Sequence, residues 1–168
     1  MRSITLLLLS IFLLGFAIDA SAQKKTIILV RHAEKDVSVA ADQNDPALSP
    51  AGVERAERLA KTIKKYRPGA VYSTNYKRTQ STAEPIAKLR KVEIQTYDPR
   101  DQAQLVDQIM KSRTKRFVVA GHSNTIPLLA NLFIKKEIFK PLDESEYGAI
   151  WIIRMKNGKP PKVEVLSY

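Results

Sequence analysis

The sequence of 168 residues contains no cysteine and only two histidines, His32 and His122. The absence of cysteine excludes disulfides, thiol nucleophiles, zinc–thiolate sites and iron–sulfur clusters. Acidic residues are also few, with 17 Asp and Glu against 28 Lys and Arg, so the formal net charge is +11. That balance favours anionic ligands such as phosphate esters, nucleic acid or acidic lipid. Any imidazole chemistry must use one or both of the two histidines.

The rest of the composition is that of a globular protein. Hydrophobic residues make up 44% and charged residues 27% of the chain, which excludes a largely disordered, collagen-like or polytopic membrane protein. The length suits one domain. Because the Lys and Arg residues are spread along the chain without interleaved aromatic residues, we interpret them as a solvated surface and expect no nucleic-acid partner.

Residues 1–22 have the order of a secretory signal peptide. A positive start at Arg2 is followed by an uncharged apolar run over residues 3–18 and by the small residues Ala20-Ser21-Ala22. The run is shorter than the roughly 20 residues that span a bilayer comfortably. We therefore expect cleavage after Ala22 and export of a domain of residues 23–168 to the periplasm or medium, without stable membrane insertion. Retention as an uncleaved N-terminal anchor is the alternative.

Strands and helices are predicted to alternate through the exported part. Apolar and β-branched runs predict strands at residues 26–30, 70–73, 92–97 and 116–120. Helices are predicted after each strand, beginning at or near Pro50, Tyr76, Gln102 and Thr125, with Pro85 expected to kink the second. Ser49 and Pro50 are typical of a helix start, since Ser caps the free N–H groups and Pro is tolerated at the first position. The apolar face of this first helix is expected to comprise Val53, Ala56, Ala60 and Ile63.

The C-terminal segment predicts a hairpin. Two strand-like runs, residues 149–155 and 162–166, flank Asn157-Gly158, a strong turn signal. Pro160 and Pro161 cannot donate ladder hydrogen bonds, which assigns the last strand to a sheet edge. The predicted fold is one α/β domain, a three-layer α/β/α sandwich whose mostly parallel sheet carries an antiparallel C-terminal addition.

Four basic or imidazole side chains follow the predicted parallel strands. Arg31-His32 ends the first strand, Arg78 follows the second, and Gly121-His122 ends the fourth. Ligands of open parallel sheets bind beyond the carboxyl ends of the strands. The helix starting near Thr125 would add free N–H groups, and an Arg fork suits two phosphate oxygens at once. The pattern predicts a phosphate site that contains imidazole.

Such a site is suited to phosphoryl transfer. A neutral histidine can attack phosphorus, while a second histidine and the guanidinium groups offset charge on the other oxygens. Each residue alone has an ordinary explanation: Arg78 as a solvated helix charge, His122 as a capping residue. The position of both histidines at strand ends favours the functional interpretation. A zinc site is disfavoured, because two distant histidines would need carboxylate partners in a strongly positive chain.

Four motifs in order resemble those of the histidine phosphatase superfamily, the phosphoglycerate mutase-like fold. They are residues 29–35 (LVRHAEK), residues 48–52 (LSPAG), Tyr72-Ser73 with Arg78-Thr79 and Thr82-Ala83, and residues 119–124 (VAGHSN). The resemblance implies a phosphohistidine at His32, with Arg31, Arg78 and His122 completing the phosphate pocket, and no metal or cofactor. Ala33 replaces the glycine usual after Arg-His, which is harmful only if its φ is positive.

The resemblance also implies a carboxylic acid that protonates the leaving oxygen, supplied by a loop over the pocket. Asp45 is the first candidate, Glu34 the second, and Asp98 or Asp101 the third. Asp45-Pro46 and Asp98-Pro99 are also ordinary turn sequences. The longest predicted loop, residues 36–48, leaves little room for a substrate-specific lid, so the sequence does not identify the substrate.

The leading hypothesis is an exported phosphomonoester hydrolase acting on a small phosphorylated substrate through His32. A non-catalytic envelope protein that binds a phosphorylated glycan or lipid in the same pocket is the alternative, and a phosphoglycerate-type mutase is less favoured. The oligomeric state is left open. In-line attack requires neutral His32, so activity is expected to fall as the pH drops through its pKa, near ~6.5 if unperturbed.

Cleavage of the N-terminal segment can be tested directly. Protein recovered from the periplasm or medium after expression of the full chain should have Gln23 as its first residue, because the Ala-Ser-Ala tripeptide precedes it. N-terminal sequencing measures this. Recovery of an intact chain in the membrane fraction would instead support the uncleaved anchor.

Overall fold

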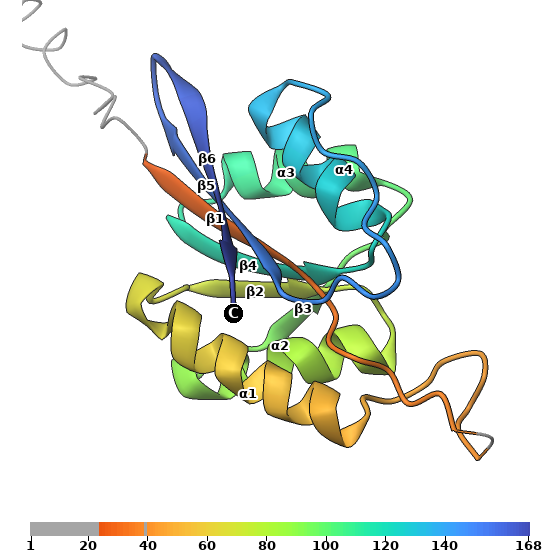
Figure 1. Cartoon of the computed structure of the whole chain (residues 1–168). Helices are drawn as coiled ribbons and strands as arrows, with labels where there is room; N and C mark the ends of the chain where they lie inside the picture. The colour runs from red at the N-terminus through yellow and green to blue at the C-terminus, as the bar shows by residue number, and fades with distance from the viewer. Residues whose placement is uncertain (1–23, 39) are drawn as a thin grey trace, which may run out of the picture.

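A six-stranded sheet forms the centre of the structure, a computed structural model that describes residues 24–38 and 40–168 (Figure 1). The strands are β1 (Lys25–Arg31), β2 (Ala70–Ser73), β3 (Ile94–Thr96), β4 (Arg116–Gly121), β5 (Ala149–Lys156) and β6 (Lys159–Ser167). Their order is β3-β2-β4-β1-β5-β6. The first four in this order are parallel, β5 is antiparallel to β1, and β6 is antiparallel to β5.

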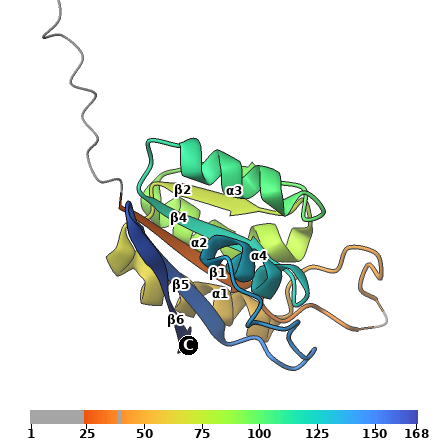
Figure 2. The same cartoon turned by 90° about the horizontal axis from the view of Figure 1, so that it is seen from above.

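Helices cover both faces of the sheet (Figures 1 and 2). They are α1 (Pro50–Ile63), which continues into a short 3₁₀ helix η1 (Lys64–Tyr66), then α2 (Lys77–Arg90), α3 (Gln102–Lys111) and α4 (Thr125–Ile134). One face is covered by α1 and α2, the other by α3 and α4. The predicted three-layer sandwich with an antiparallel C-terminal addition is thus confirmed.

The two hydrophobic cores meet at β1. Ile27 and Leu29 pack in the core beneath α3 and α4, whereas Ile28 and Val30 pack in the core beneath α1 and α2. All four side chains are fully buried. Full burial of one such side chain stabilises the fold by about 1.5–3 kcal/mol, which explains why a continuous apolar run forms this central strand.

Most predicted elements are present, with changes at their ends. The third strand is shorter than the predicted residues 92–97, and α2 continues through Pro85. The hairpin forms around Asn157 and Gly158, and β6 lies at the sheet edge as predicted. The predicted signal peptide, residues 1–22, lies outside the described residues. In the part that the structure describes, no helix has the length and apolar character needed to cross a membrane.

The predicted inner face of α1 was wrong at Val53, which is 53% exposed. Gly52 faces inward in its place, because the helix backbone approaches the backbone of Glu34 closely there. A Cβ on Gly52 would collide with the Glu34 carbonyl oxygen. Ser49 caps this end of the helix by accepting a hydrogen bond from Gly52 N at 3.1 Å. The Leu-Ser-Pro-Ala-Gly motif thus fixes α1 against the segment that follows β1.

Candidate active site

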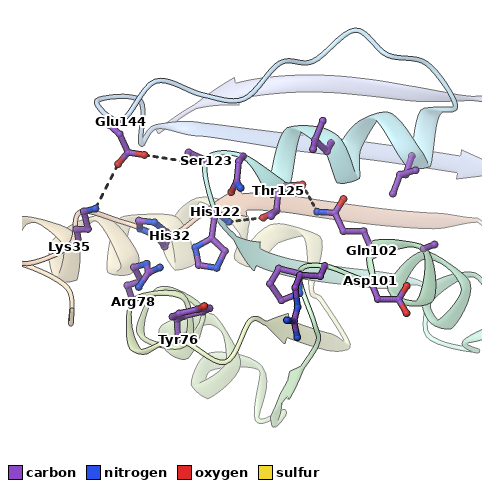
Figure 3. Close-up of a pocket in the computed structure, with 16 residues that line it drawn as sticks. His32, Lys35, Tyr76, Arg78, Asp101, Gln102, His122, Ser123, Thr125 and Glu144 are labelled. Carbon is purple, nitrogen blue, oxygen red and sulfur yellow. Dashed lines mark hydrogen bonds and ion pairs between the residues drawn. The ribbon is translucent and has the colours of Figure 1, made fainter. Parts of the chain in front are cut away.

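The pairing of β1 with β4 brings the two histidines together. Arg31 is in register with Gly121, and His32 N–H donates to the Gly121 carbonyl at 2.8 Å. The two imidazole rings lie edge to face with centroids 5.5 Å apart (Figure 3). Two residues far apart in sequence therefore share one site at the carboxyl ends of parallel strands.

A cavity of about 960 Å³ opens beside this pair. At one end its lining includes His32, His122, Arg78, Lys35 and Glu144; the other end extends past Asp101 and Gln102 to Leu128 and Leu132. The start of α4 also contributes, through Ser123, Asn124 and Thr125. The cavity therefore has a polar end that contains the histidines and an end bounded by leucines of α4.

The His32 side chain has the geometry of a nucleophile. Its ring is 4% exposed, and Nδ1 lies 2.7 Å from the Ala33 carbonyl. Because a carbonyl oxygen can only accept, Nδ1 carries the proton and Nε2 carries the lone pair. Among the described residues, Nε2 has no hydrogen-bond partner. This hydrogen bond to the backbone holds the ring in place.

Ala33 is accommodated without strain. It is fully buried, its φ is not positive, and its N–H donates to the Thr82 hydroxyl at 2.9 Å. Thr82 lies in α2 and in turn donates to the carbonyl of Arg78 at 2.7 Å. The Thr-Ala motif of α2 therefore ties the helix that carries Arg78 to the residue next to His32.

His122 is held from two sides. Its Nε2 lies 3.0 Å from the Thr74 hydroxyl, and its backbone N–H donates to the Thr125 hydroxyl at 3.0 Å. The Tyr76 ring packs edge-on against the imidazole at a centroid distance of 5.1 Å. These contacts leave Nδ1 as the ring nitrogen available to a ligand.

Arg78 lies in the first turn of α2 and lines the cavity. Its side chain is 16% exposed, and its guanidinium stacks on Tyr76 with the central carbon 4.5 Å from the ring centroid. Asp45 lies 3.5 Å from the Arg78 NH1 group and also accepts from Lys77 N–H at 3.0 Å. Asp45, the first candidate for the acid, therefore positions Arg78 and the start of α2, and it does not line the cavity.

Arg31 is placed beside the cavity and does not line it. Its side chain is 1% exposed, and NH1 donates to the carbonyls of Asp143, Glu144 and Glu146 at 2.7, 3.2 and 2.9 Å. The guanidinium also stacks on Tyr147, 4.1 Å from the ring centroid. Arg31 therefore anchors the segment before β5 while its positive charge stays close to His32.

This segment, residues 135–148, corrects the prediction that little chain is available over the site. It brings Glu144 to the cavity, a residue that the sequence reasoning missed. The Glu144 carboxylate lies 3.1 Å from Arg31 NH2 and 3.8 Å from Lys35 Nζ, and accepts from the Ser123 hydroxyl at 3.2 Å (Figure 3). The only sequence signal was a run of acidic residues before the fifth strand.

The remaining carboxylate candidates have other partners. Glu34 binds Arg55 through Nε at 2.8 Å and NH2 at 2.6 Å, facing α1 and not the cavity. This pairing lowers the pKa of the Glu34 carboxyl. Asp98 pairs with Arg100 at 2.9 Å, and Asp101 caps α3 by accepting from Gln104 N–H at 3.0 Å. Of these candidates, only Asp101 lines the cavity.

Both imidazoles have strongly lowered pKa values. Burial lowers the pKa of His32 to about 3, with Arg31, His122 and Arg78 adding to the effect against the Ala33 hydrogen bond. Burial followed by Arg78 and Arg31 lowers the pKa of His122 to about 4. The pKa of His32 is therefore not the unperturbed value near 6.5, and the fall in activity that the sequence predicted moves to far lower pH in the free protein.

The charge around the histidines favours an anionic ligand. Arg31, Lys35 and Arg78 surround two neutral rings, and the start of α4 adds the positive end of a helix dipole. Within residues 24–38 and 40–168, no three His, Asp or Glu side chains form a group that could hold a metal ion. What the polar end can do is bind a phosphate-like anion next to an unprotonated imidazole nitrogen.

The sequence matches one known family, the histidine phosphatase superfamily (branch 1), over residues 27–99. This match contains the motifs around His32 and Arg78. No curated protein sequence matches the chain significantly.

Several solved structures have the same fold at low sequence identity. A putative phosphohistidine phosphatase SixA from Agrobacterium tumefaciens has a TM-score of 0.64 and 15% identity, covering 86% of this chain and 99% of its own. A phosphoserine phosphatase from Entamoeba histolytica, in complex with 3-phosphoglyceric acid, has a TM-score of 0.65 and 16% identity, and the match covers 86% of this chain and 98% of that protein. A mycobacterial glucosyl-3-phosphoglycerate phosphatase complexed with VO3 has a TM-score of 0.69 and 12% identity, and the match covers 85% of this chain and 98% of that protein.

The lowered histidine pKa values predict a pH-dependent stability. A histidine whose pKa is lower in the folded than in the unfolded state binds its proton more readily when unfolded, so its contribution is complete above pH ~6.5 and is lost below it. For His32, titrating at about 3 when folded, the free energy of unfolding should fall by about 1.4 kcal/mol per pH unit well below pH 6.5.

Urea unfolding between pH 7.5 and 5 measures this dependence, and His32→Asn should reduce its slope, with His122 supplying what remains. The same wild-type free energy of unfolding at both ends of the range would show that the histidines titrate normally in the folded state.

Proposed function

Since residues 27–99 match the histidine phosphatase superfamily, we propose that this chain is a phosphomonoester hydrolase that acts through a phosphohistidine at His32. One observation carries the proposal: an imidazole with its proton on Nδ1 and its free Nε2 lies at a cavity lined by Arg78 and His122. A nucleophile needs that lone pair, and the surrounding positive charge supplies the anion site.

In the first step the lone pair of His32 Nε2 attacks phosphorus, and the bond to the leaving oxygen breaks. The ring becomes positively charged as the N–P bond forms. The Ala33 carbonyl, which accepts from Nδ1–H at 2.7 Å, stabilises that charge. In the second step water attacks the phosphohistidine, the N–P bond breaks, and the electron pair returns to Nε2 as phosphate leaves.

The oxygens of the phosphoryl group being transferred meet four kinds of donor. Arg78 supplies a guanidinium, and His122 supplies Nδ1–H when Thr74 donates its hydroxyl proton to Nε2. Lys35 and the start of α4 line the same end of the cavity. Arg31 acts indirectly, through its charge and through the segment that it anchors.

Glu144 is our candidate for the acid that protonates the leaving oxygen. Partial burial raises the pKa of its carboxyl, but Arg31, the Ser123 hydroxyl and Lys35 lower it by more. A dianionic phosphate ester bound beside it would oppose those cations and raise the pKa, favouring the protonated form. Glu144 would then give its proton to the leaving oxygen and recover one from the attacking water.

The proposal includes export, which rests on the signal-peptide pattern of residues 1–22 alone. A small phosphorylated molecule outside the cytoplasm is the expected substrate. Binding without turnover, the non-catalytic alternative, is an outcome of the experiment below.

The phosphohistidine can be trapped. Rapid acid-free quenching during turnover of ³²P-labelled ester should leave label on His32, stable to alkali and labile in acid as expected of a phosphoramidate. His32→Ala should lose both label and hydrolysis while still binding phosphate.

Hydrolysis is also expected to need no metal ion. Chelator-treated, dialysed protein should keep its full rate, because Arg78, Lys35 and His122 supply the positive charge that the phosphoryl group needs. Label on His122, or a rate restored only by a divalent ion, would contradict the mechanism.

The role of Glu144 is tested by changing the leaving group. Glu144→Gln should lower kcat/KM for alkyl phosphates by about 10²-fold or more, because an alkoxide needs a proton to leave. For p-nitrophenyl phosphate, whose leaving anion is stable, the loss should be much smaller. Asp45→Asn is the matched control and should show no such dependence on the leaving group. Equal losses for both esters of Glu144→Gln would exclude Glu144 as the proton donor.

A further inference from the structure

A second cavity adjoins the catalytic cavity along α4. This second cavity, of about 900 Å³, shares Gln102, Leu128 and Leu132 with the catalytic one. We name it the α4 groove; its other lining residues include Phe139, Lys135 and Lys140. The two cavities therefore adjoin at these side chains, and a molecule bound at His32 that extends along α4 passes over the exposed Leu128 and Leu132.

The shared wall of the α4 groove is apolar and open. Leu128 and Leu132, one helical turn apart, are 46% and 45% exposed. The other leucine of α4, Leu129, is fully buried in the core. Exposed leucines next to a polar catalytic end are unfavourable in water and become favourable when an apolar ligand covers them.

The groove is built by specific hydrogen bonds that fix its far side. Asn131, 8% exposed, donates from its amide to the Phe139 carbonyl at 2.8 Å and accepts from Phe139 N–H at 2.9 Å. Phe139 in turn packs edge-on against Trp151, with ring centroids 5.9 Å apart. At the near side, Gln102 donates to the Thr125 carbonyl at 2.8 Å (Figure 3). The groove is thus preorganised on both sides.

The charges at the rim complement an anionic molecule. Lys135, Lys136 and Lys140 line the groove against a single carboxylate, Glu137. These lysines and Arg78 give this face a positive potential, which attracts an amphiphile whose phosphate group binds at His32. A neutral sugar, in contrast, would leave Leu128 and Leu132 exposed to water.

From the two adjoining cavities and the exposed leucines between them we propose that the α4 groove binds the apolar chain of the leaving alcohol, so that the preferred substrates are phosphate monoesters of long-chain alcohols. This inference rests on the proposed function and names its substrate class. The phosphate lies at His32, and the chain covers Leu128 and Leu132.

A chain-length series tests the proposal. Ethyl, butyl and octyl phosphate, kept below their critical micelle concentrations, should be hydrolysed with kcat/KM rising at least about tenfold from ethyl to octyl, since each added methylene removes apolar surface from water. In the double variant Leu128→Gln with Leu132→Gln, the octyl-to-ethyl ratio should fall to below about a third of the wild-type ratio. Leu89→Gln is the matched control, because Leu89 is 53% exposed on α2 across the sheet; its ratio should equal that of the wild type.

Binding of ethyl- and octylphosphonate, measured by calorimetry, separates this inference from the proposed function because phosphonates are not hydrolysed. Tighter binding of octylphosphonate that is lost in the double variant supports the groove even if no ester is turned over, an outcome that would overturn only the hydrolase. Equal kcat/KM and equal affinity for the short and long chains would overturn the groove and leave the hydrolase intact.

Discussion

The parallel pairing of β1 with β4 is the constraint on which the site depends. The four apolar residues of β1, Ile27 to Val30, pack alternately into the two cores, and a shift by one residue would exchange the buried sets on its two faces. The register that buries them also pairs Arg31 with Gly121 and lets His32 N–H donate to the Gly121 carbonyl. The separation of the two imidazoles is therefore set by hydrophobic packing that lies away from the chemistry.

Arg31 links this strand end to the segment before β5. Its guanidinium is buried, and three carbonyls accept from NH1. Within the described residues its Nε is buried without a partner, a loss of about 1–3 kcal/mol that the remaining contacts must offset. The arrangement holds Glu144 at the cavity and a fixed positive charge beside His32. One side chain thus connects the nucleophile with the candidate acid.

Burial and charge act together on the histidines. Both lower the pKa values, so the rings are neutral although three cations surround them. The same cations attract a phosphate group, whose negative charge then offsets their effect on His32 and Glu144. The polar end of the cavity is thereby suited to an anion, while Leu128 and Leu132 suit the other end to apolar groups.

The sequence by itself determined what depends on near neighbours along the chain. The apolar run of β1, the Ser-Pro start of α1, the Asn-Gly turn and the placement of Arg31, His32 and His122 at strand ends all follow from local propensity and pattern. The three-layer fold also follows, because alternating strands and helices have few ways to bury their apolar faces. Whether Ala33 is tolerated in place of glycine could not be predicted from the sequence, since its φ is a property of the folded backbone.

Tertiary structure decided the direction of each carboxylate. Asp45 and Glu34 both have positions in the sequence that suit the acid. In the folded protein, however, Asp45 binds Lys77 N–H and Arg78, and Glu34 binds Arg55, so both have structural roles. The acidic run before β5 did not single out Glu144, because the place of this carboxylate is set by an arginine 113 residues earlier. The pKa values and the position of the α4 groove beside the cavity likewise arise only when distant segments pack, since burial, charge proximity and cavity shape are properties of contacts that no sequence window contains.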